Sequence, residues 1–165
     1  DNNSVSVYRN IGTGVGNIGY AARVSFATGL QPAAIAVGDV DGDGKADLAV
    51  TNLFGGSSLS ILKNTSTGAG NVGFATKVDV ATSAGPNSIA IGDLNQDGKA
   101  DLVVTNYLGS SNSVSVFKNS RSTTGIISFA AKVDYATGTT PRAVAITDLD
   151  GNGKLDLAEI GRAHV

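Results

Sequence analysis

The chain has 165 residues, of which 41% are hydrophobic, and this is enough for one domain with a buried core. It has no cysteine, which excludes a disulfide framework and thiol chemistry. Its net charge is −2 without a long run of one sign, and no apolar run approaches the ~18 residues of a membrane span, so we expect no nucleic-acid partner and no membrane insertion.

Three copies of one unit follow one another along the chain. Each copy carries an acidic loop, and the loops begin at Asp39, Asp93 and Asp148, which are 54 and 55 residues apart. A complete unit holds four short apolar or alternating runs separated by Gly, Asn, Asp and Ser, which predicts a four-stranded antiparallel meander. In the second unit the predicted strands are Ser88–Ile91, Ala100–Thr105, Val114–Lys118 and Phe129–Tyr135.

In chain order, the sequence begins in the middle of a unit. Residues 4–28 match the third and fourth strands, 33–82 and 88–137 are complete units, and 143–158 match the first and second strands. Four strands in each unit of about 50 residues predict an all-β fold of β-propeller blades, whereas a β-sandwich does not predict such similar units. Residues 1–158 are therefore expected to form about three blades' worth of a partial propeller. Because propellers have about 4–8 blades, the chain is either a piece of a longer propeller or a protomer of a homo-oligomer that closes a ring.

The last seven residues, 159–165, read EIGRAHV and depart from the repeat. One back-translation of them resembles a sequencing-adapter sequence. We expect this tail to be non-native or disordered, and we assign no role to His164, the chain's one histidine.

The three acidic loops share the pattern D-x-[DN]-x-[DN]-G-x-x-D. Oxygen ligands at alternate positions can surround a hard cation, and Ca²⁺ accepts 6–8 oxygens at about 2.3–2.6 Å. The glycine at position six is expected to adopt a positive φ, and the lysine at position seven is expected to offer its carbonyl. The predicted ligands, for up to three Ca²⁺ ions, are Asp39, Asp41, Asp43, Lys45 and Asp47; Asp93, Asn95, Asp97, Lys99 and Asp101; and Asp148, Asp150, Asn152, Lys154 and Asp156.

The third loop also matches the EF-hand pattern, because Glu159 stands at its twelfth position. The first two loops have Val50 and Val104 there, inside apolar runs that predict strands. An EF-hand needs a bidentate Glu and flanking helices, so we interpret this match as accidental.

The three loops, DVDGDGKADLAVTN (39–52), DLNQDGKADLVVTN (93–106) and DLDGNGKLDL (148–157), resemble the FG-GAP/VCBS repeats of integrin α-chain propellers and of many extracellular proteins. The resemblance covers about residues 4–158. It implies propeller blades with structural Ca²⁺ in the loop between the first and second strands of each blade.

The resemblance also implies an extracellular or cell-surface protein that binds a protein or carbohydrate ligand. The alternatives are a non-catalytic module of a secreted enzyme and a lectin. No nucleophile–base set stands outside the loops, so we do not expect an enzyme. Tyr107 and Tyr135 occupy positions that vary between the repeats, and they are weak candidates for ligand contact.

Overall fold

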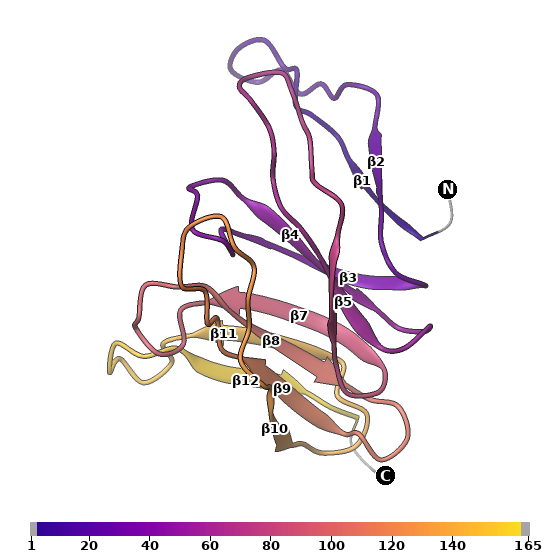
Figure 1. The fold of residues 1–165 in the computed structure, drawn as a ribbon, viewed down its shortest axis with the longest axis vertical. Helices are drawn as coiled ribbons and strands as arrows, with labels where there is room; N and C mark the ends of the chain where they lie inside the picture. Colours follow the sequence, from indigo (N-terminus) through magenta and orange to yellow (C-terminus); the bar gives the residue numbers. More distant parts are fainter. Residues whose placement is uncertain (1–2, 163–165) are drawn as a thin grey trace.

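The computed structural model describes residues 3–162, and this part of the chain consists of β-strands joined by turns and loops (Figure 1). The predicted all-β architecture of four-stranded antiparallel sheets is confirmed. No helix in this part of the chain has the length and hydropathy needed to cross a membrane. The strands are β1 (Ser4–Val7), β2 (Val24–Ala27), β3 (Pro32–Gly38), β4 (Asp47–Asn52), β5 (Ser58–Leu62), β6 (Val78–Ala81), β7 (Pro86–Gly92), β8 (Asp101–Asn106), β9 (Ser113–Phe117), β10 (Val133–Ala136), β11 (Ala143–Thr147) and β12 (Asp156–Ile160).

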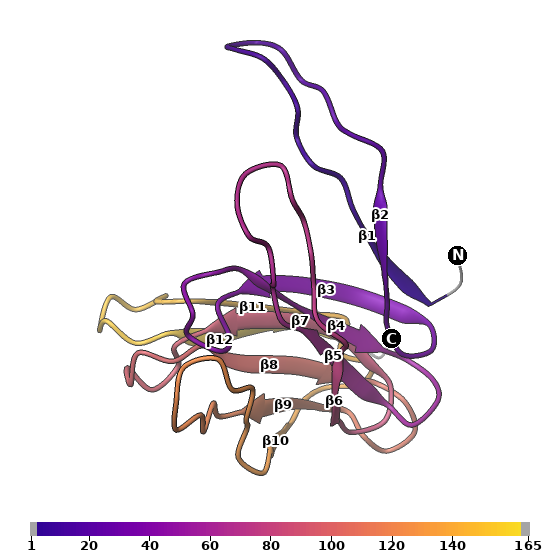
Figure 2. The same cartoon turned by 45° about the horizontal axis from the view of Figure 1, so that its top comes forward.

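The strands form two complete blades and two half-blades. The first blade has the strand order β3-β4-β5-β6 and the second blade has β7-β8-β9-β10, each a simple antiparallel meander. Strands β1 and β2 form the front half-blade, and β11 and β12 form the back half-blade. The two half-blades lie at opposite ends of the molecule, with the complete blades between them (Figure 1), and in Figure 2 the front half-blade stands apart from the other sheets.

The second strand of each complete blade is buried along its whole length. Strands β4 (DLAVTN) and β8 (DLVVTN) have strands on both sides within their sheets and neighbouring sheets against their faces. Such a position favours a nearly continuous apolar run rather than an alternating one. The two threonines and two asparagines in these strands are buried as well, and they satisfy polar groups of neighbouring strands.

The largest core cluster lies between the two complete blades. The first blade contributes small and branched side chains that include Ala36 and Ala49, and the second blade contributes larger ones that include Ile89 and Leu102. A second cluster around Leu48 packs the first blade against the front half-blade. The hydrophobic core is therefore repeated at these two blade interfaces, as expected for a repeat architecture.

The fourth predicted strand of the second unit begins later than expected. Residue Phe129 forms only an isolated bridge with Asn119, and β10 begins at Val133, opposite Val116 of β9. Between these two pairings, the β9 side covers three residues, from Val116 to Asn119, and the β10 side covers four, from Phe129 to Val133. The β10 side therefore has one extra residue, a bulge that interrupts the pairing within the predicted strand Phe129–Tyr135.

The predicted tail begins inside a strand. Strand β12 extends to Ile160, where it pairs with Ala143 of β11. Glu159 occupies the position of the buried Val50 and Val104, and its Oε1 atom is buried without a hydrogen-bond partner among residues 3–162. Residues 163–165 of the predicted tail lie outside the described part of the chain, and the non-native origin of the tail stays a prediction.

Candidate metal centre

The acidic loops are the turns between the first and second strands of each sheet, namely β3–β4, β7–β8 and β11–β12. The glycines at position six have positive φ, with values of 83° at Gly44, 76° at Gly98 and 83° at Gly153, as the sequence predicts. A positive φ also occurs at position four, where Gln96 stands in the second loop with φ of 61°. Each loop therefore contains two left-handed residues that fold it back on itself.

The first loop brings three predicted ligands together. The carboxylates of Asp39, Asp41 and Asp43 each place one oxygen within 4.8 Å of the other two. The Asp39 carboxylate accepts hydrogen bonds from the N–H groups of Gly42 (2.6 Å) and Gly44 (2.8 Å), which hold the loop around it. Three carboxylates at this spacing concentrate negative charge in a small volume. Because like charges repel, this arrangement favours the binding of a cation.

The fourth carboxylate of this loop, Asp47, lies outside this group and binds main-chain N–H groups of the loop. Its Oδ2 atom accepts the N–H of Val40 at 3.0 Å and of Asp41 at 3.3 Å, and its Oδ1 atom accepts the N–H of Asn64 at 2.8 Å. Burial raises the pKa of this carboxyl above its ordinary range, although the N–H groups of Asn64 and Val40 pull the pKa down. Asp47 thus ties the loop to the end of the third strand.

Lys63 is a residue of the first acidic site that the sequence reasoning missed. Its ammonium group pairs with the fully buried carboxylate of Asp41, and it lies 3.2 Å from Oδ2 of Asp43. The hydrogen bond to Asp41 raises the pKa of Lys63. Desolvation raises the pKa of Asp43, but the N–H of Lys45 and the ammonium of Lys63 outweigh it and leave the pKa below its ordinary value. The signal was present as a Lys-Asn pair after the third strand in both complete units.

The second loop has the same framework with one carboxylate fewer. The Asp93 carboxylate accepts the N–H of Asp97 at 3.1 Å and of Gly98 at 2.7 Å, and the Asn95 side chain accepts the N–H of Asp97 at 2.9 Å. Asp101 is buried and accepts the N–H of Leu94 at 3.1 Å, as Asp47 accepts that of Val40. The second loop thus offers the carboxylates of Asp93 and Asp97 and the amide oxygen of Asn95, each of which accepts backbone N–H groups of the same loop.

The third loop also gathers three carboxylates, although they are a different set. Asp148, Asp150 and Asp156 lie within 4.8 Å of one another, and the Asn152 amide donates to Asp150 at 2.8 Å. The N–H of Gly153 lowers the pKa of Asp148, and those of Gly151 and Asn152 add to this effect. The first position of this loop is thus held in its charged form by the backbone.

The lysines at position seven bind the side chains at position five through their main chain. The N–H groups of Lys45, Lys99 and Lys154 donate to the position-five side chains at 3.0, 3.1 and 2.8 Å. Coordination by their carbonyl groups stays a prediction. The donor set as a whole consists of carboxylate and amide oxygens on a flexible loop, and this chemistry fits a hard cation such as Ca²⁺.

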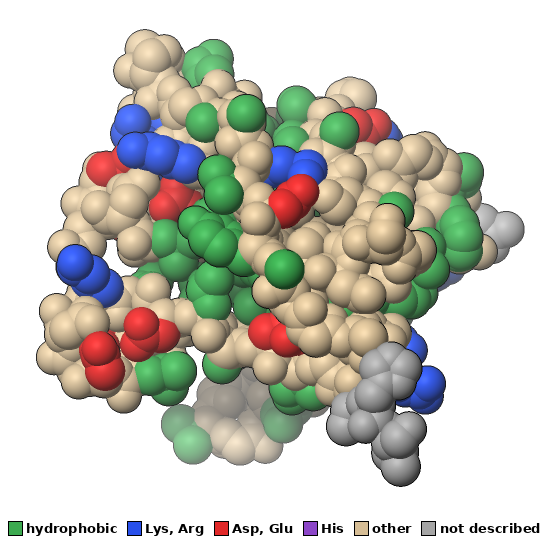
Figure 3. Space-filling model, turned by 90° about the horizontal axis from the view of Figure 1, so that it is seen from below, with side chains coloured by type: hydrophobic (Ala, Val, Ile, Leu, Met, Phe, Trp, Pro, Cys, Tyr) green, Lys and Arg blue, Asp and Glu red, His purple; other side chains and the backbone are tan. Residues whose placement is uncertain are grey.

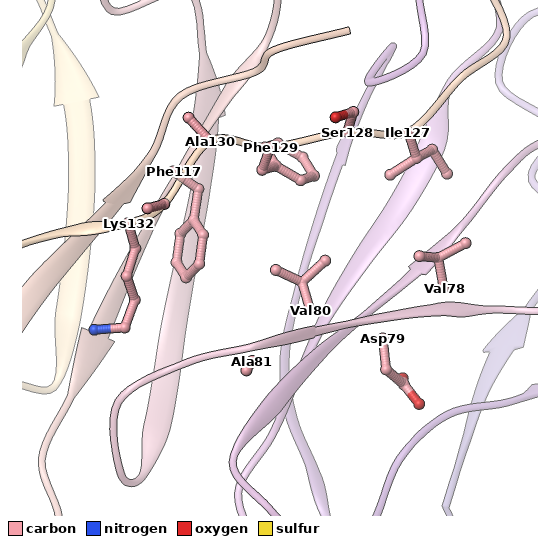
Figure 4. Close-up of a pocket in the computed structure, with 11 residues that line it drawn as sticks. Val78, Asp79, Val80, Ala81, Phe117, Ile127, Ser128, Phe129, Ala130 and Lys132 are labelled. Atoms are coloured by element: carbon pink, nitrogen blue, oxygen red, sulfur yellow. The ribbon is translucent and has the colours of Figure 1, made fainter.

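Apolar grooves open at the outer ends of the blade interfaces. One groove, of about 440 Å³, lies between Val78 and Val80 of β6 and the side chains of Phe117, Ile127 and Phe129 (Figure 4). Figure 3 shows a face of the molecule on which hydrophobic side chains gather in a hollow, with charged side chains beside it. A second groove occupies the repeat-equivalent place between the front half-blade and the first blade. Because both grooves are lined by equivalent core residues, they are features of blade packing.

The two candidate tyrosines lie in different environments. The guanidinium carbon of Arg142 lies 5.0 Å from the ring centroid of the half-buried Tyr107, which is a cation–π contact that the sequence did not reveal. Tyr135 lies on β10 and is exposed. Their contact with a ligand stays a prediction.

Comparison with known protein families agrees with this geometry. The family model of the FG-GAP-like repeat matches residues 1–50, and that of the FG-GAP repeat matches residues 32–73 and 85–117. A search of curated proteins found no significant match. The matched segments include the acidic loops of both complete blades and most strands of these blades. Together they cover more than half of the chain. The chain therefore belongs to the FG-GAP repeat family, and its four-stranded sheets are propeller blades.

Proposed function

We propose that the chain is a calcium-stabilised propeller module of an extracellular protein that binds a protein or glycan ligand. The observation that carries the calcium part is the grouping of Asp39, Asp41 and Asp43 within 4.8 Å of one another. In addition, FG-GAP repeats occur in extracellular proteins and often bind Ca²⁺. We propose a binding role rather than a catalytic one, because the gathered acidic groups occupy loops suited to holding a cation.

The proposed ions are structural. Mg²⁺ demands a nearly ideal octahedron, whereas Ca²⁺ tolerates the irregular donor sets that these loops offer. A cation that binds only the folded chain raises its stability by RT ln(1 + [Ca²⁺]/Kd), which is about 2.7 kcal/mol at a hundredfold excess over Kd. We therefore expect Ca²⁺ to raise the melting temperature and Mg²⁺ to do so weakly.

Isothermal titration with CaCl₂ and thermal unfolding in Ca²⁺ and in EDTA test this proposal. Asp41→Asn removes one carboxylate from the first loop and is expected to abolish one binding event. Asp79→Asn is the matched control, because it makes the same change in charge outside the acidic loops, on β6. An equal melting temperature in Ca²⁺ and EDTA, without heat of binding, would overturn the calcium part.

The ligand part is tested separately. A glycan array probed in Ca²⁺ and again in EDTA examines carbohydrate binding, and Tyr107→Ala examines the tyrosine that Arg142 covers. Binding that disappears with the chelator and weakens in Tyr107→Ala would support a glycan ligand. A silent array would count against a glycan and leave a protein ligand as the proposal.

A further inference from the structure

The two half-blades supply the missing halves of one blade. The front half-blade contains the third and fourth strands of a unit, and the back half-blade contains the first and second strands. Within residues 3–162, β1 has a partner only in β2, and β12 has a partner only in β11. Each half-blade thus ends in an unpaired strand edge, and the two edges lie at opposite ends of the molecule (Figure 1).

The first blade has an apolar surface where its neighbour's first two strands are missing. Ile35 on β3 is 47% exposed, whereas its repeat equivalent Ile89 is 8% exposed because the first blade covers it. An open groove of about 580 Å³ follows this surface, and it is lined by Val5, Val7, Ile35 and Val37 among others. The groove therefore lies where two further strands would complete the blade.

The back half-blade presents the complementary surface. Its outward face carries Ala145, Ala158 and Ile160, which are the repeat equivalents of Ala36, Ala49 and Thr51. Ala36 and Ala49 belong to the core between the two complete blades. Ile160 is 66% exposed, whereas the equivalent Thr51 is fully buried. The interface between the two complete blades is thus a template for how this face could pack against Ile35.

One pair of substitutions between the repeats supports this contact. A side chain at Gly38 would lie 2.8 Å from Ile91, and one at Gly92 would lie 2.6 Å from Ile146. The back half-blade has Thr147 at the position of these glycines, so a blade packed against it needs a smaller side chain than isoleucine at the facing position. In the proposed contact, Thr147 would face Val37, the smaller repeat equivalent of Ile91 and Ile146.

Exposed tyrosines mark the outer part of the same two ends. Tyr20 is the repeat equivalent of Phe74, and Tyr135 is the equivalent of Phe26. Phe26 and Phe74 form an edge-to-face pair across a blade interface, with ring centroids 4.9 Å apart. Tyr20 and Tyr135 are 59% and 55% exposed, and they would meet in the same way if the ends of two chains joined.

A hydrogen bond repeated in both complete blades is also divided between the ends. The position-nine aspartate accepts the N–H of the asparagine after the third strand at 2.8 Å, both in Asp47–Asn64 and in Asp101–Asn119. In the divided blade these groups are Asp156 on the back half-blade and the exposed Asn10 on the front half-blade.

We propose that two copies of this chain associate head to tail, so that each back half-blade completes the front half-blade of the other copy. Transfer of the β4–β5 register places Ala158 opposite Val7 of the partner subunit, and Ile160 opposite Val5 of the partner subunit. Each copy contributes two blades and two half-blades, so two copies close a ring of six blades, within the usual range of about 4–8. Both junctions are heterologous and the ring closes on itself.

The first experiment is the molar mass of the chain in Ca²⁺, measured by light scattering after size exclusion. The expected mass is twice the chain mass of 16.5 kDa. A monomer at all concentrations would overturn the proposal and assign the missing strands to a segment outside these residues. Three or more copies, or continuous growth with concentration, would overturn the two-copy ring. The apolar side chains proposed to meet at the junction lie on β1, β3 and β12 rather than in the acidic loops, so a failed calcium titration would not by itself overturn the two-copy ring.

Two variants test the head-to-tail arrangement. Ile35→Asp and Ile160→Asp each place a charge in both junctions of a homodimer, and each is expected to be a folded monomer because both positions are exposed in the single chain. An equimolar mixture retains one unaltered junction, so dimers should reappear. Val15→Asp, on a fully exposed loop, is the control and should remain dimeric. Failure of the mixture to recover dimers would overturn the arrangement.

Disulfide trapping tests the register without relying on disruptive variants. The chain has no cysteine, so Val7→Cys combined with Ala158→Cys introduces only the intended pair. Directly opposed residues on paired strands have Cα atoms close enough for a disulfide. We expect cross-linked dimers on oxidation, whereas Ser6→Cys with Ala158→Cys, which is one residue out of register, should remain largely uncross-linked. Equal cross-linking of both pairs would overturn the register.

Discussion

The side-chain amide of Asn119 donates a hydrogen bond of 2.8 Å to the carbonyl of Val40, which lies 79 residues earlier in the first acidic loop. The same amide donates to the carbonyl of Ala100 at 2.9 Å, and Asn119 is fully buried. One side chain therefore joins the loops of both complete blades.

Asn119→Ala is expected to lower the free energy of unfolding by about 3 kcal/mol, because two carbonyl groups lose their donor in a buried place. Asn64→Ala is the matched comparison, because the Asn64 amide bonds to Ala46 in a more exposed place, and we expect a loss of about 1 kcal/mol. Urea denaturation measures both. Equal losses would contradict the bridging role of Asn119.

Lys63→Met should change stability and calcium affinity in opposite directions. Without Ca²⁺ it leaves the buried Asp41 carboxylate without its cation, and we expect a loss of about 3 kcal/mol in the free energy of unfolding. In calcium titrations it removes a competing positive charge, so the affinity of the first loop should rise roughly tenfold. Lys118→Met, whose ammonium lies 3.6 Å from Asp97, serves as a weaker counterpart. Unchanged affinity in Lys63→Met would show that Lys63 does not compete with the ion.

Gly29→Ala and Gly138→Ala make the same change at repeat-equivalent positions with different surroundings. A Cβ atom at Gly29 would lie 2.6 Å from Cγ of Asn52, whose Oδ1 atom accepts the Gly29 N–H at 3.0 Å. Displacement of this buried amide should cost about 1–2 kcal/mol. No atom lies within 4 Å of a Cβ at Gly138, so that variant should be nearly neutral. Thermal unfolding separates the two, and similar melting temperatures would count against the packing argument.

Glu159→Val should stabilise the chain. The change restores the valine of the other two repeats and removes a carboxylate oxygen that is buried without a partner among the described residues. The expected gain is about 1–3 kcal/mol in the free energy of unfolding. Glu159→Gln removes the charge but keeps an unpaired polar group, so it should gain less. Denaturation at one protein concentration compares all three, and a loss of stability in the valine variant would refute this reading of the tail.

Asp134 gives the fold one identifiable source of acid sensitivity. Desolvation raises the pKa of its carboxyl, but hydrogen bonds from Lys132, Ser115 and Ser83 outweigh this and lower the pKa below the ordinary value of 3.8. The charged form therefore stabilises the fold above the unfolded-state pKa, and this contribution disappears as the pH falls through the folded-state pKa. Because more than a third of the side chain is exposed, solvent screening limits the effect to about 1 kcal/mol or less.

Asp134→Asn should accordingly be less stable than the unaltered chain at pH 6, and the difference should shrink as the pH falls below about 4. Urea denaturation in EDTA across this range measures the difference and keeps calcium binding out of the comparison. A difference that stays constant with pH would contradict the assignment.

The strand order and the loop geometry were predictable because both depend on local sequence patterns. Turn residues divide each unit into four runs, and a glycine at position six of the acidic loop predicts a positive φ, as Gly44 shows. The pairing of Lys63 with Asp41 and the bond from Asn119 to Val40 depend on how strands and blades meet, which spacing along the chain does not encode. The bulge before Val133 was missed for a similar reason, since an extra residue leaves the apolar run unbroken.

The bond between Asp47 and Asn64 has a mechanical consequence. It fastens the acidic loop at one end of β4 to the chain leaving β5, so a load that peels β5 from β4 must also pull on the loop. The ladder bonds of two antiparallel strands can break one after another under such a load, whereas a loop gathered around a divalent cation resists opening as a unit. With Ca²⁺ bound as proposed, extension of a tethered molecule would meet resistance at the acidic loops, and the force at which a blade yields would depend on the calcium concentration of its surroundings.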